Sequence, residues 1–185
     1  MIRQLLLAGL AMSGWTTAAS AQSQQRWGIQ GSGALVFPTA EERDFQNTTR
    51  LGWEAQIRYT FSNFSLGAGY QRSTVYQFET GDFSAAVSVV FLEPRYVVTA
   101  SSLAALYLAG RVGMGQLVCN PETDCAEQEM DVAFGGGGGA LVRLSGRAAL
   151  DIGVQYFTTR YDVALGEKQR AGYILARLGV SVGIL

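Results

Sequence analysis

The sequence of 185 residues contains no histidine. Histidine is the side chain that most often acts as a general acid or base near neutral pH, and it is a common metal ligand. Its absence removes the catalytic arrangements that depend on it, and the chain carries no other catalytic or cofactor motif. We therefore expect neither enzyme activity nor a bound cofactor.

Lysine is almost as scarce, because Lys168 is the sole example. A water-soluble domain of this size normally exposes many lysines, so the scarcity argues against a large solvated surface. The 14 basic and 15 acidic residues give a formal net charge of −1. Such a balance provides no electrostatic basis for binding nucleic acid.

A long hydrophobic run is also missing near the start of the chain. The apolar run Leu5–Met12 is too short to cross a bilayer as a helix, which needs about 20 residues. It follows a basic start at Arg3 and precedes Ala19-Ser20-Ala21, small residues of the kind that a signal peptidase reads. These features predict a cleaved signal peptide over residues 1–21 and one mature domain over residues 22–185.

Cysteine is limited to Cys119 and Cys125, which lie in a polar, acidic stretch. Export places such a pair in an oxidising compartment, so we expect a disulfide within one loop. Two free thiols in a flexible loop are the alternative. A metal site is not expected, because a cysteine pair without histidine supplies only half of a tetrahedral ligand set.

What the sequence does contain is an alternation of apolar and polar residues with a period of two. The segment Arg50–Phe61 is the clearest example, with an apolar face that comprises Leu51, Trp53, Ala55, Ile57, Tyr59 and Phe61. Successive side chains of a strand point to opposite faces, so this segment is predicted to be a strand with one oily side. Seven further strands are predicted at Arg26–Phe37, Phe64–Thr74, Ser84–Val98, Ala105–Gln116, Met130–Leu144, Ala148–Thr159 and Gln169–Leu185.

The connections between these strands alternate in length. Long, polar connections follow the odd strands at Pro38–Thr49, Val75–Phe83, Leu117–Glu129 and Arg160–Lys168, and the first three of these are mainly acidic. Shorter ones follow the even strands at Ser62-Asn63, Thr99–Ala104 and Ser145–Arg147. Short periplasmic turns and longer external loops on an even number of strands are typical of bacterial outer-membrane barrels. The predicted fold is therefore all-β, an eight-stranded antiparallel up-and-down transmembrane barrel.

A soluble barrel that holds a small ligand in the periplasm would also alternate, with its oily face inside. Three features favour the membrane. The polar faces are rich in small residues that suit a crowded lumen, lysine is scarce, and aromatic residues gather near the ends of the oily faces. The expected periplasmic belt comprises Trp27, Tyr59, Phe61, Phe64 and Tyr96, and the outer belt comprises Phe37, Trp53, Tyr70 and Tyr156.

Two further stretches, Phe91–Tyr96 and Tyr107–Arg111, are similar to stretches of a known group of proteins. Together with the signal peptide and the loop pattern, they resemble the small outer-membrane β-barrel proteins of the OmpA-transmembrane-domain and OmpW/OmpX-like type. The resemblance implies a location in the outer membrane, with membrane lipid and the outer-membrane assembly machinery as partners. That group usually ends in Phe or Trp, whereas this chain ends in Leu185. Barrel enzymes of outer membranes generally rely on a histidine, which this chain lacks.

The charged residues on the polar faces are the candidate functional residues. An eight-stranded barrel is only wide enough for its side chains to fill it, so these charges are expected to meet in a paired network. The predicted network comprises Glu54, Arg58, Glu93, Arg95, Arg111, Arg143, Asp151 and Arg177, with help from Gln56, Gln155 and Tyr107. An ion path through the lumen is the alternative.

The segment Ser84–Val98 does not fit a single register. If Glu93 and Arg95 face inward, apolar Val87, Val89 and Phe91 do so too, unless a bulge near Pro94 shifts the face. Glu93 and Arg95 are interpreted as a salt bridge at the rim rather than a catalytic pair. The run Gly135–Gly139 is interpreted as close packing or strong local curvature, because no phosphate-binding motif follows it.

Three functions remain open from the sequence. The leading one is a non-enzymatic membrane protein with a plugged lumen, which supports the envelope or presents its acidic loops to the outside. The second is a narrow channel or a lateral gate for small hydrophobic solutes, and the third is the soluble periplasmic barrel. A monomer is favoured, although the sequence leaves the oligomeric state open.

Overall fold

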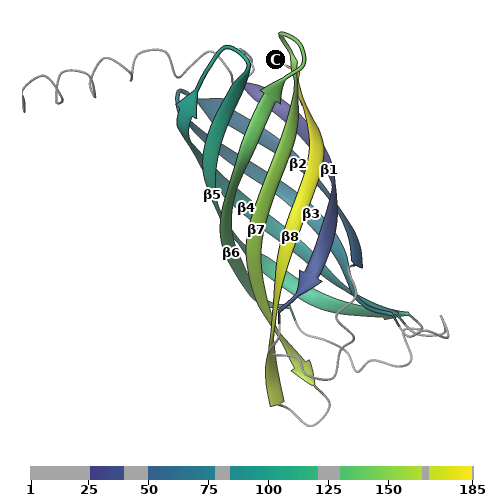
Figure 1. Cartoon of the computed structure of the whole chain (residues 1–185). Helices are drawn as coiled ribbons and strands as arrows, with labels where there is room; N and C mark the ends of the chain where they lie inside the picture. Colours follow the sequence, from purple (N-terminus) through teal and green to yellow (C-terminus); the bar gives the residue numbers. More distant parts are fainter. Residues whose placement is uncertain (1–25, 40–49, 78–83, 121–129, 164–166, 185) are drawn as a thin grey trace, which may run out of the picture.

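The computed structural model describes residues 26–39, 50–77, 84–120, 130–163 and 167–184, which form a closed barrel of eight antiparallel strands (Figure 1). Each strand pairs with the next along the chain, and β1 also pairs with β8 to close the sheet. The strands are β1 (Trp27–Pro38), β2 (Arg50–Phe61), β3 (Phe64–Gln77), β4 (Ser84–Ala100), β5 (Ala104–Asn120), β6 (Asp131–Arg143), β7 (Ala148–Val163) and β8 (Glu167–Gly183). The predicted fold class is confirmed. Within the described ranges, no helix has the length and apolar character needed to cross a membrane.

The two ends of the barrel differ in their connections. One end, called the turn end here, carries the short connections after β2, β4 and β6 together with the first and last described residues. The tightest is the two-residue hairpin turn Ser62-Asn63, in which Ser62 has a φ of 55° and Phe61 pairs with Phe64. The opposite end, called the loop end, carries the other four connections.

The predicted loop Arg160–Lys168 between β7 and β8 was too long, because most of these residues belong to the two strands. Both strands continue past the predicted boundaries, and pairing runs from Arg160 opposite Arg170 to Val163 opposite Glu167. This hairpin reaches beyond the other strands at the lower end of Figure 1. Its polar sequence indicated a loop, but backbone hydrogen bonds between two adjacent antiparallel strands do not require apolar side chains.

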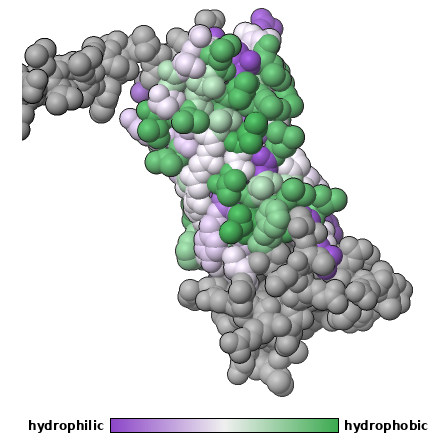
Figure 2. All heavy atoms as spheres, viewed as in Figure 1, coloured by the Kyte–Doolittle hydropathy of each residue, from purple (hydrophilic) through white to green (hydrophobic). Residues whose placement is uncertain are grey.

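The apolar face of each strand points away from the barrel. Leu51 is 72% exposed and Val154 is 56% exposed, whereas Glu54 and Arg177 are only 3% and 4% exposed. Figure 2 shows the resulting surface, on which hydrophobic residues cover much of the barrel wall. The predicted orientation of the strand faces is therefore confirmed, with the apolar face outward and the charged face inward.

Strand β4 keeps one register through Pro94, so it has no bulge there, which the sequence had left open. Leu92 pairs with Val112 and Arg95 with Ala109 in the same register, and the irregularity falls later, between Val97 and Thr99. The inward face of β4 consequently carries both kinds of residue, namely Val87, Val89, Phe91, Glu93, Arg95 and Val97, all of which are buried. A proline whose backbone nitrogen is not needed by a ladder hydrogen bond does not disturb the strand.

The glycine run of β6 is a site of close packing, as one of its two interpretations predicted. A Cβ atom at lumen-facing Gly139 would lie 2.5 Å from the Tyr107 hydroxyl oxygen and 2.4 Å from the Ile152 carbonyl oxygen. At Gly136, on the outer face, the nearest atom is the Ala109 carbonyl oxygen at 3.5 Å, which is an ordinary contact. The Tyr107 side chain can lie against this wall only because Gly139 has no side chain.

This difference between two glycines of β6 predicts different outcomes for the same substitution. We expect Gly139→Ala to lower the free energy of unfolding by about 1–3 kcal/mol, since the added methyl group overpacks the lumen. The matched control Gly136→Ala should change it by less than about 0.5 kcal/mol. Urea unfolding of the refolded barrel in lipid vesicles measures both values. Equal effects of the two substitutions would contradict the close packing of Tyr107.

Candidate functional site

The lumen contains a layer of charged side chains near its middle. Seven almost fully buried charged residues from five strands form this layer, which we call the lumen network: Glu54, Arg58, Glu93, Arg95, Arg111, Asp151 and Arg177. Each lies on the inward face of its strand because it shares the period-two position of its buried neighbours. Four arginines face three carboxylates, so the network holds an excess of one positive charge.

Glu93 is the centre of the lumen network, because all four arginines contact its carboxylate. Its Oε1 atom accepts hydrogen bonds from Arg58 Nη2 at 2.8 Å and from Arg95 Nε at 2.7 Å. Its Oε2 atom accepts from Arg177 Nη1 at 3.1 Å and from Arg111 Nε at 2.9 Å. The Glu93 side chain has no exposed surface, so its charge is compensated inside the protein by these four arginines.

The other two carboxylates link the same arginines into one network. Glu54 accepts hydrogen bonds from Arg111 Nη2 at 2.8 Å and from Arg177 Nη1 at 3.0 Å. Asp151 accepts from Arg95 Nη1 at 2.7 Å and lies 3.6 Å from Arg177 Nη2. Arg95 and Arg111 therefore bridge two carboxylates each, and Arg177 contacts all three. Each carboxylate is held by at least two arginines.

Arg58 differs from the other three arginines, because Glu93 is its only acidic partner in the lumen network. Its remaining contacts are neutral: the guanidinium donates to Gln56 Oε1 at 2.6 Å, to Ser65 Oγ at 3.1 Å and to the Glu93 carbonyl oxygen at 3.3 Å. Arg58 thus represents the one positive charge that the network carries in excess.

Neutral side chains complete the network. Tyr107 donates its hydroxyl hydrogen to Asp151 Oδ1 at 2.5 Å and accepts from Arg177 Nη2 at 2.8 Å, while Gln155 donates to Glu93 Oε2 at 2.9 Å. Sequence reasoning missed Gln71 and Gln30, which accept hydrogen bonds from Arg111 at 2.5 Å and from Arg95 at 3.3 Å. The sequence could have identified both, because each occupies one of the alternate positions of its strand, β3 or β1, that face the lumen.

Apolar side chains close the lumen on the loop side of the network, which the sequence did not predict. The buried cluster there comprises Ala34, Val36, Val87, Val89, Phe91, Ala133, Phe157, Tyr173 and Leu175. On β1, β4 and β8, these residues lie closer to the loop end than the polar lumen residues of the same strand, and on β7 Phe157 lies between Gln155 and buried Thr159. The sequence left open an inward position for Val87, Val89 and Phe91, but the other inward-facing positions were expected to be polar, so a complete apolar layer was not predicted.

A smaller apolar cluster lies on the turn side of the network. It comprises Val97, Ala105, Tyr107 and Ala109. Two arginines contact aromatic rings of these layers: the guanidinium of Arg111 lies 3.8 Å from the ring centre of Phe91, and that of Arg95 lies 4.4 Å from that of Tyr107. The charged layer is thus enclosed between two apolar layers and attached to both by cation–π contacts.

Two predictions about charged residues need correction. Arg143 lies outside the lumen network: it is partly exposed in the last position of β6, at the turn end, and makes no side-chain ion pair with any described residue. Glu93 and Arg95 do not form a salt bridge at the rim, because both are buried at the centre of the lumen. In each case the sequence predicted the correct face of the strand, but it predicted the wrong position of the residue along the barrel axis.

The predicted aromatic belts occupy the outer face. At the turn end Trp27, Tyr59, Phe61 and Phe64 form consecutive ring contacts of 4.9, 6.0 and 4.9 Å, and Tyr96 pairs with Phe64 across the strands. Nearer the loop end Trp53 contacts Tyr70 at 5.4 Å, while Phe37 and Tyr156 are exposed. Cys125 lies outside the described residues, so the Cys119–Cys125 disulfide stays a prediction.

The charge count of the lumen network predicts unequal effects of two substitutions. Glu93→Gln leaves four buried arginines with two carboxylates, and we expect the free energy of unfolding to fall by about 3–5 kcal/mol. Arg58→Gln leaves three arginines with three carboxylates, so its cost should be clearly smaller. Urea unfolding in lipid vesicles compares the two variants. A larger loss for Arg58→Gln would disprove the central role of Glu93.

Comparisons with known proteins identify the fold. Neisserial surface protein A matches with a TM-score of 0.69 at 12% identity, over 85% of this chain and 97% of that one. The N-terminal β-barrel domain of Pseudomonas aeruginosa OprF matches with 0.54 at 12% identity, over 85% and 97%. Ail, the attachment invasion locus protein of Yersinia pestis, matches with 0.53 at 14% identity, over 84% and 98%. No family model and no curated protein sequence matches the chain.

These structures share the architecture of this chain but little of its sequence, so the likeness concerns the fold. Each is matched over nearly its whole length by the eight strands described above. The chain therefore has the fold of the small eight-stranded β-barrels of bacterial outer membranes.

Proposed function

We propose that this protein is a non-enzymatic integral protein of the bacterial outer membrane, with a plugged lumen and a role in envelope integrity or in contacts made by its surface loops. The observation that supports it is the layered lumen, in which seven charged residues joined by ion pairs lie between two apolar clusters. The outward-facing apolar residues and the fold of the neighbours support the location. Export through a signal peptide over residues 1–21 belongs to the same proposal.

The layered lumen argues against the channel. A hydrated ion on this path would have to lose its water to enter an apolar layer, and then separate Glu93 from several arginines at once. A lateral gate meets a different obstacle, because β1 and β8 pair without interruption from Gly28 opposite Gly183 to Pro38 opposite Tyr173. No feature of the described residues favours either alternative.

The non-enzymatic role rests on the state of the carboxylates. Glu54, Glu93 and Asp151 are each held by arginines inside the lumen network and have at most 3% of their surface exposed. A general acid or base must reach its substrate within hydrogen-bond distance, directly or through one water. These carboxylates are enclosed by protein on both sides, so they serve the packing of the lumen.

The surface role concerns the connections at the loop end. Residues 40–49, 78–83 and 121–129 lie outside the described ranges, and their sequences carry acidic residues at Glu41, Glu42, Asp44, Glu79, Asp82, Glu122, Asp124, Glu127 and Glu129. In the proposed orientation these acidic segments face the exterior, while the turn end faces the periplasm.

Conductance measurements test the plugged lumen. We expect the purified protein to give no discrete openings in a planar lipid bilayer, because the apolar clusters and the lumen network block the path. Reproducible openings of one size would overturn the proposal in favour of a channel. A conducting porin recorded in the same bilayer verifies insertion conditions, and the mobility shift between boiled and unboiled samples in SDS gels verifies that the barrel is closed.

Cell fractionation tests the location. We expect the protein to stay in the membrane pellet through high-salt washes and to leave it only with detergent, since its outer surface is apolar. A soluble periplasmic control protein should be released by osmotic shock alone. Release of this protein with that control would instead favour the soluble ligand-binding barrel.

A further inference from the structure

The excess positive charge of the lumen network has no carboxylate to balance it in the described half of the barrel that includes the turn end. Arg58 represents that charge, and its one acidic partner, Glu93, is shared with three other arginines. The described ranges contain three acidic residues outside the network, and all of them lie in strand segments at the loop end: Asp131, Asp162 and Glu167. A buried charge is costly unless it is compensated, so Arg58 requires a further negative partner.

Two buried nitrogen atoms at this charge lack a hydrogen-bond acceptor among the described residues. They are Nε of Arg58 and Nε2 of Gln56, which belong to residues that are 7% and 5% exposed. The two side chains are joined, because Arg58 Nη2 donates to Gln56 Oε1 at 2.6 Å. Buried N–H groups are almost always hydrogen-bonded. Two unpaired donors beside an uncompensated positive charge provide the contacts that an anion needs.

The lumen beside Arg58 is lined by residues with small side chains. The paired positions on the neighbouring strands are Gly28 of β1 and Gly67 of β3. The guanidinium lies over Gly67, where an added Cβ atom would be 2.7 Å from Arg58 Nη2. At Gly28, by contrast, the nearest side-chain atom to an added Cβ would be Ser181 Oγ at 3.8 Å, and Gly28 itself pairs with Gly183 of β8. The guanidinium therefore leaves the β1 and β8 side unfilled.

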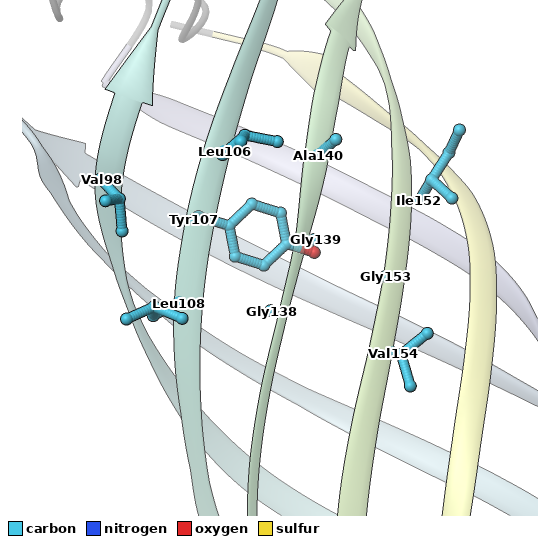
Figure 3. Close-up of a pocket in the computed structure, with 10 residues that line it drawn as sticks. All are labelled: Val98, Leu106, Tyr107, Leu108, Gly138, Gly139, Ala140, Ile152, Gly153 and Val154. Atoms are coloured by element: carbon cyan, nitrogen blue, oxygen red, sulfur yellow. The ribbon is translucent and has the colours of Figure 1, made fainter.

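The opposite wall of the lumen is filled by larger side chains. Tyr107 extends from β5 toward Gly139 of β6 (Figure 3), and an added Cβ atom at Gly153 of β7 would lie 2.9 Å from its hydroxyl oxygen. The buried apolar cluster on the turn side of the network also comes from β4 and β5. A small solute that enters from the turn end therefore reaches the network along β1, β2 and β8.

Arg58 is the arginine of the network that is most accessible. Its side chain is 8% exposed, whereas those of the other three arginines are at most 2% exposed. On β2, Thr60 occupies the last inward-facing position between Arg58 and the hairpin turn. The described residues at the turn end include three further arginines and no acidic residue: Arg26, Arg143 and Arg147. A mouth of one charge raises the local concentration of the opposite ion.

We propose that the turn side of the lumen network binds one small inorganic anion of the size of chloride. The anion accepts hydrogen bonds from Arg58 Nε and Gln56 Nε2 and supplies the negative charge that the network lacks. A small ion is favoured because the interior of an eight-stranded barrel is nearly filled by its side chains. The apolar cluster on the loop side prevents the anion from passing further, so the site goes beyond the plugged lumen and does not require conductance.

The first test locates the ion. Crystals of the protein grown in sodium bromide are measured at the bromine absorption edge, where bromide gives an anomalous signal and water does not. We expect one anomalous peak within hydrogen-bond distance of Arg58 Nε. An ordered water molecule at that position without an anomalous signal, or a lumen without any peak, would overturn the proposal.

The second test measures whether the anion stabilises the fold. Urea unfolding in phosphatidylcholine vesicles is compared in sodium chloride and in sodium gluconate at equal ionic strength, because gluconate is too large to enter the site. A ligand that binds only the folded state stabilises it, so the wild-type midpoint should be higher in chloride. Arg58→Gln removes the excess charge and should have equal midpoints in the two salts. The matched control Arg72→Gln, at an exposed position of β3, should keep the wild-type difference.

Two results of the unfolding experiment would contradict the site. Equal midpoints of the wild-type protein would show that chloride does not bind the folded barrel. A chloride effect that persists in Arg58→Gln would show that the salt acts elsewhere. Both results are independent of the conductance measurement, because the anion enters and leaves by the turn end.

Discussion

The structure depends on the closure of its sheet, which pairs the backbone hydrogen-bonding groups of neighbouring strands within the protein. In the proposed location this closure is a requirement, because lipid offers no partner for these groups. Here closure is achieved with eight strands, with β8 pairing to β1. A barrel of this size has an interior that side chains fill completely. The inward faces are consequently forced to pack against one another, and charged residues such as Glu93 and Arg111 meet inside.

That enforced meeting explains the composition of the lumen. A buried charge is costly unless it is paired and hydrogen-bonded, and Glu93 satisfies this condition by contacting all four arginines. The apolar clusters on either side exclude water and hold the arginines against Phe91 and Tyr107. The same crowding explains Gly139, whose missing side chain leaves the space that Tyr107 occupies. Pairing, packing and closure therefore stabilise one arrangement together.

The strengths and failures of the sequence predictions have identifiable causes. Strand Arg50–Phe61 was predicted with its observed bounds because its two faces differ sharply in polarity. Ser84–Val98 resisted assignment because its inward face changes from apolar Val87 and Val89 to charged Glu93 and Arg95. The hairpin beyond Arg160 was missed because backbone pairing can continue where side-chain alternation ends.

The sequence by itself determined which side chains face outward and how many strands there are, because the period-two pattern depends only on the local geometry of an extended chain. It also indicated which residues carry charge into the lumen. Only the tertiary structure decided that Glu93 is the centre of the network, that Arg143 is excluded from it, and that apolar layers enclose it. The level of each residue along the axis follows from the tilt and stagger of strands in the closed barrel, which no single strand encodes.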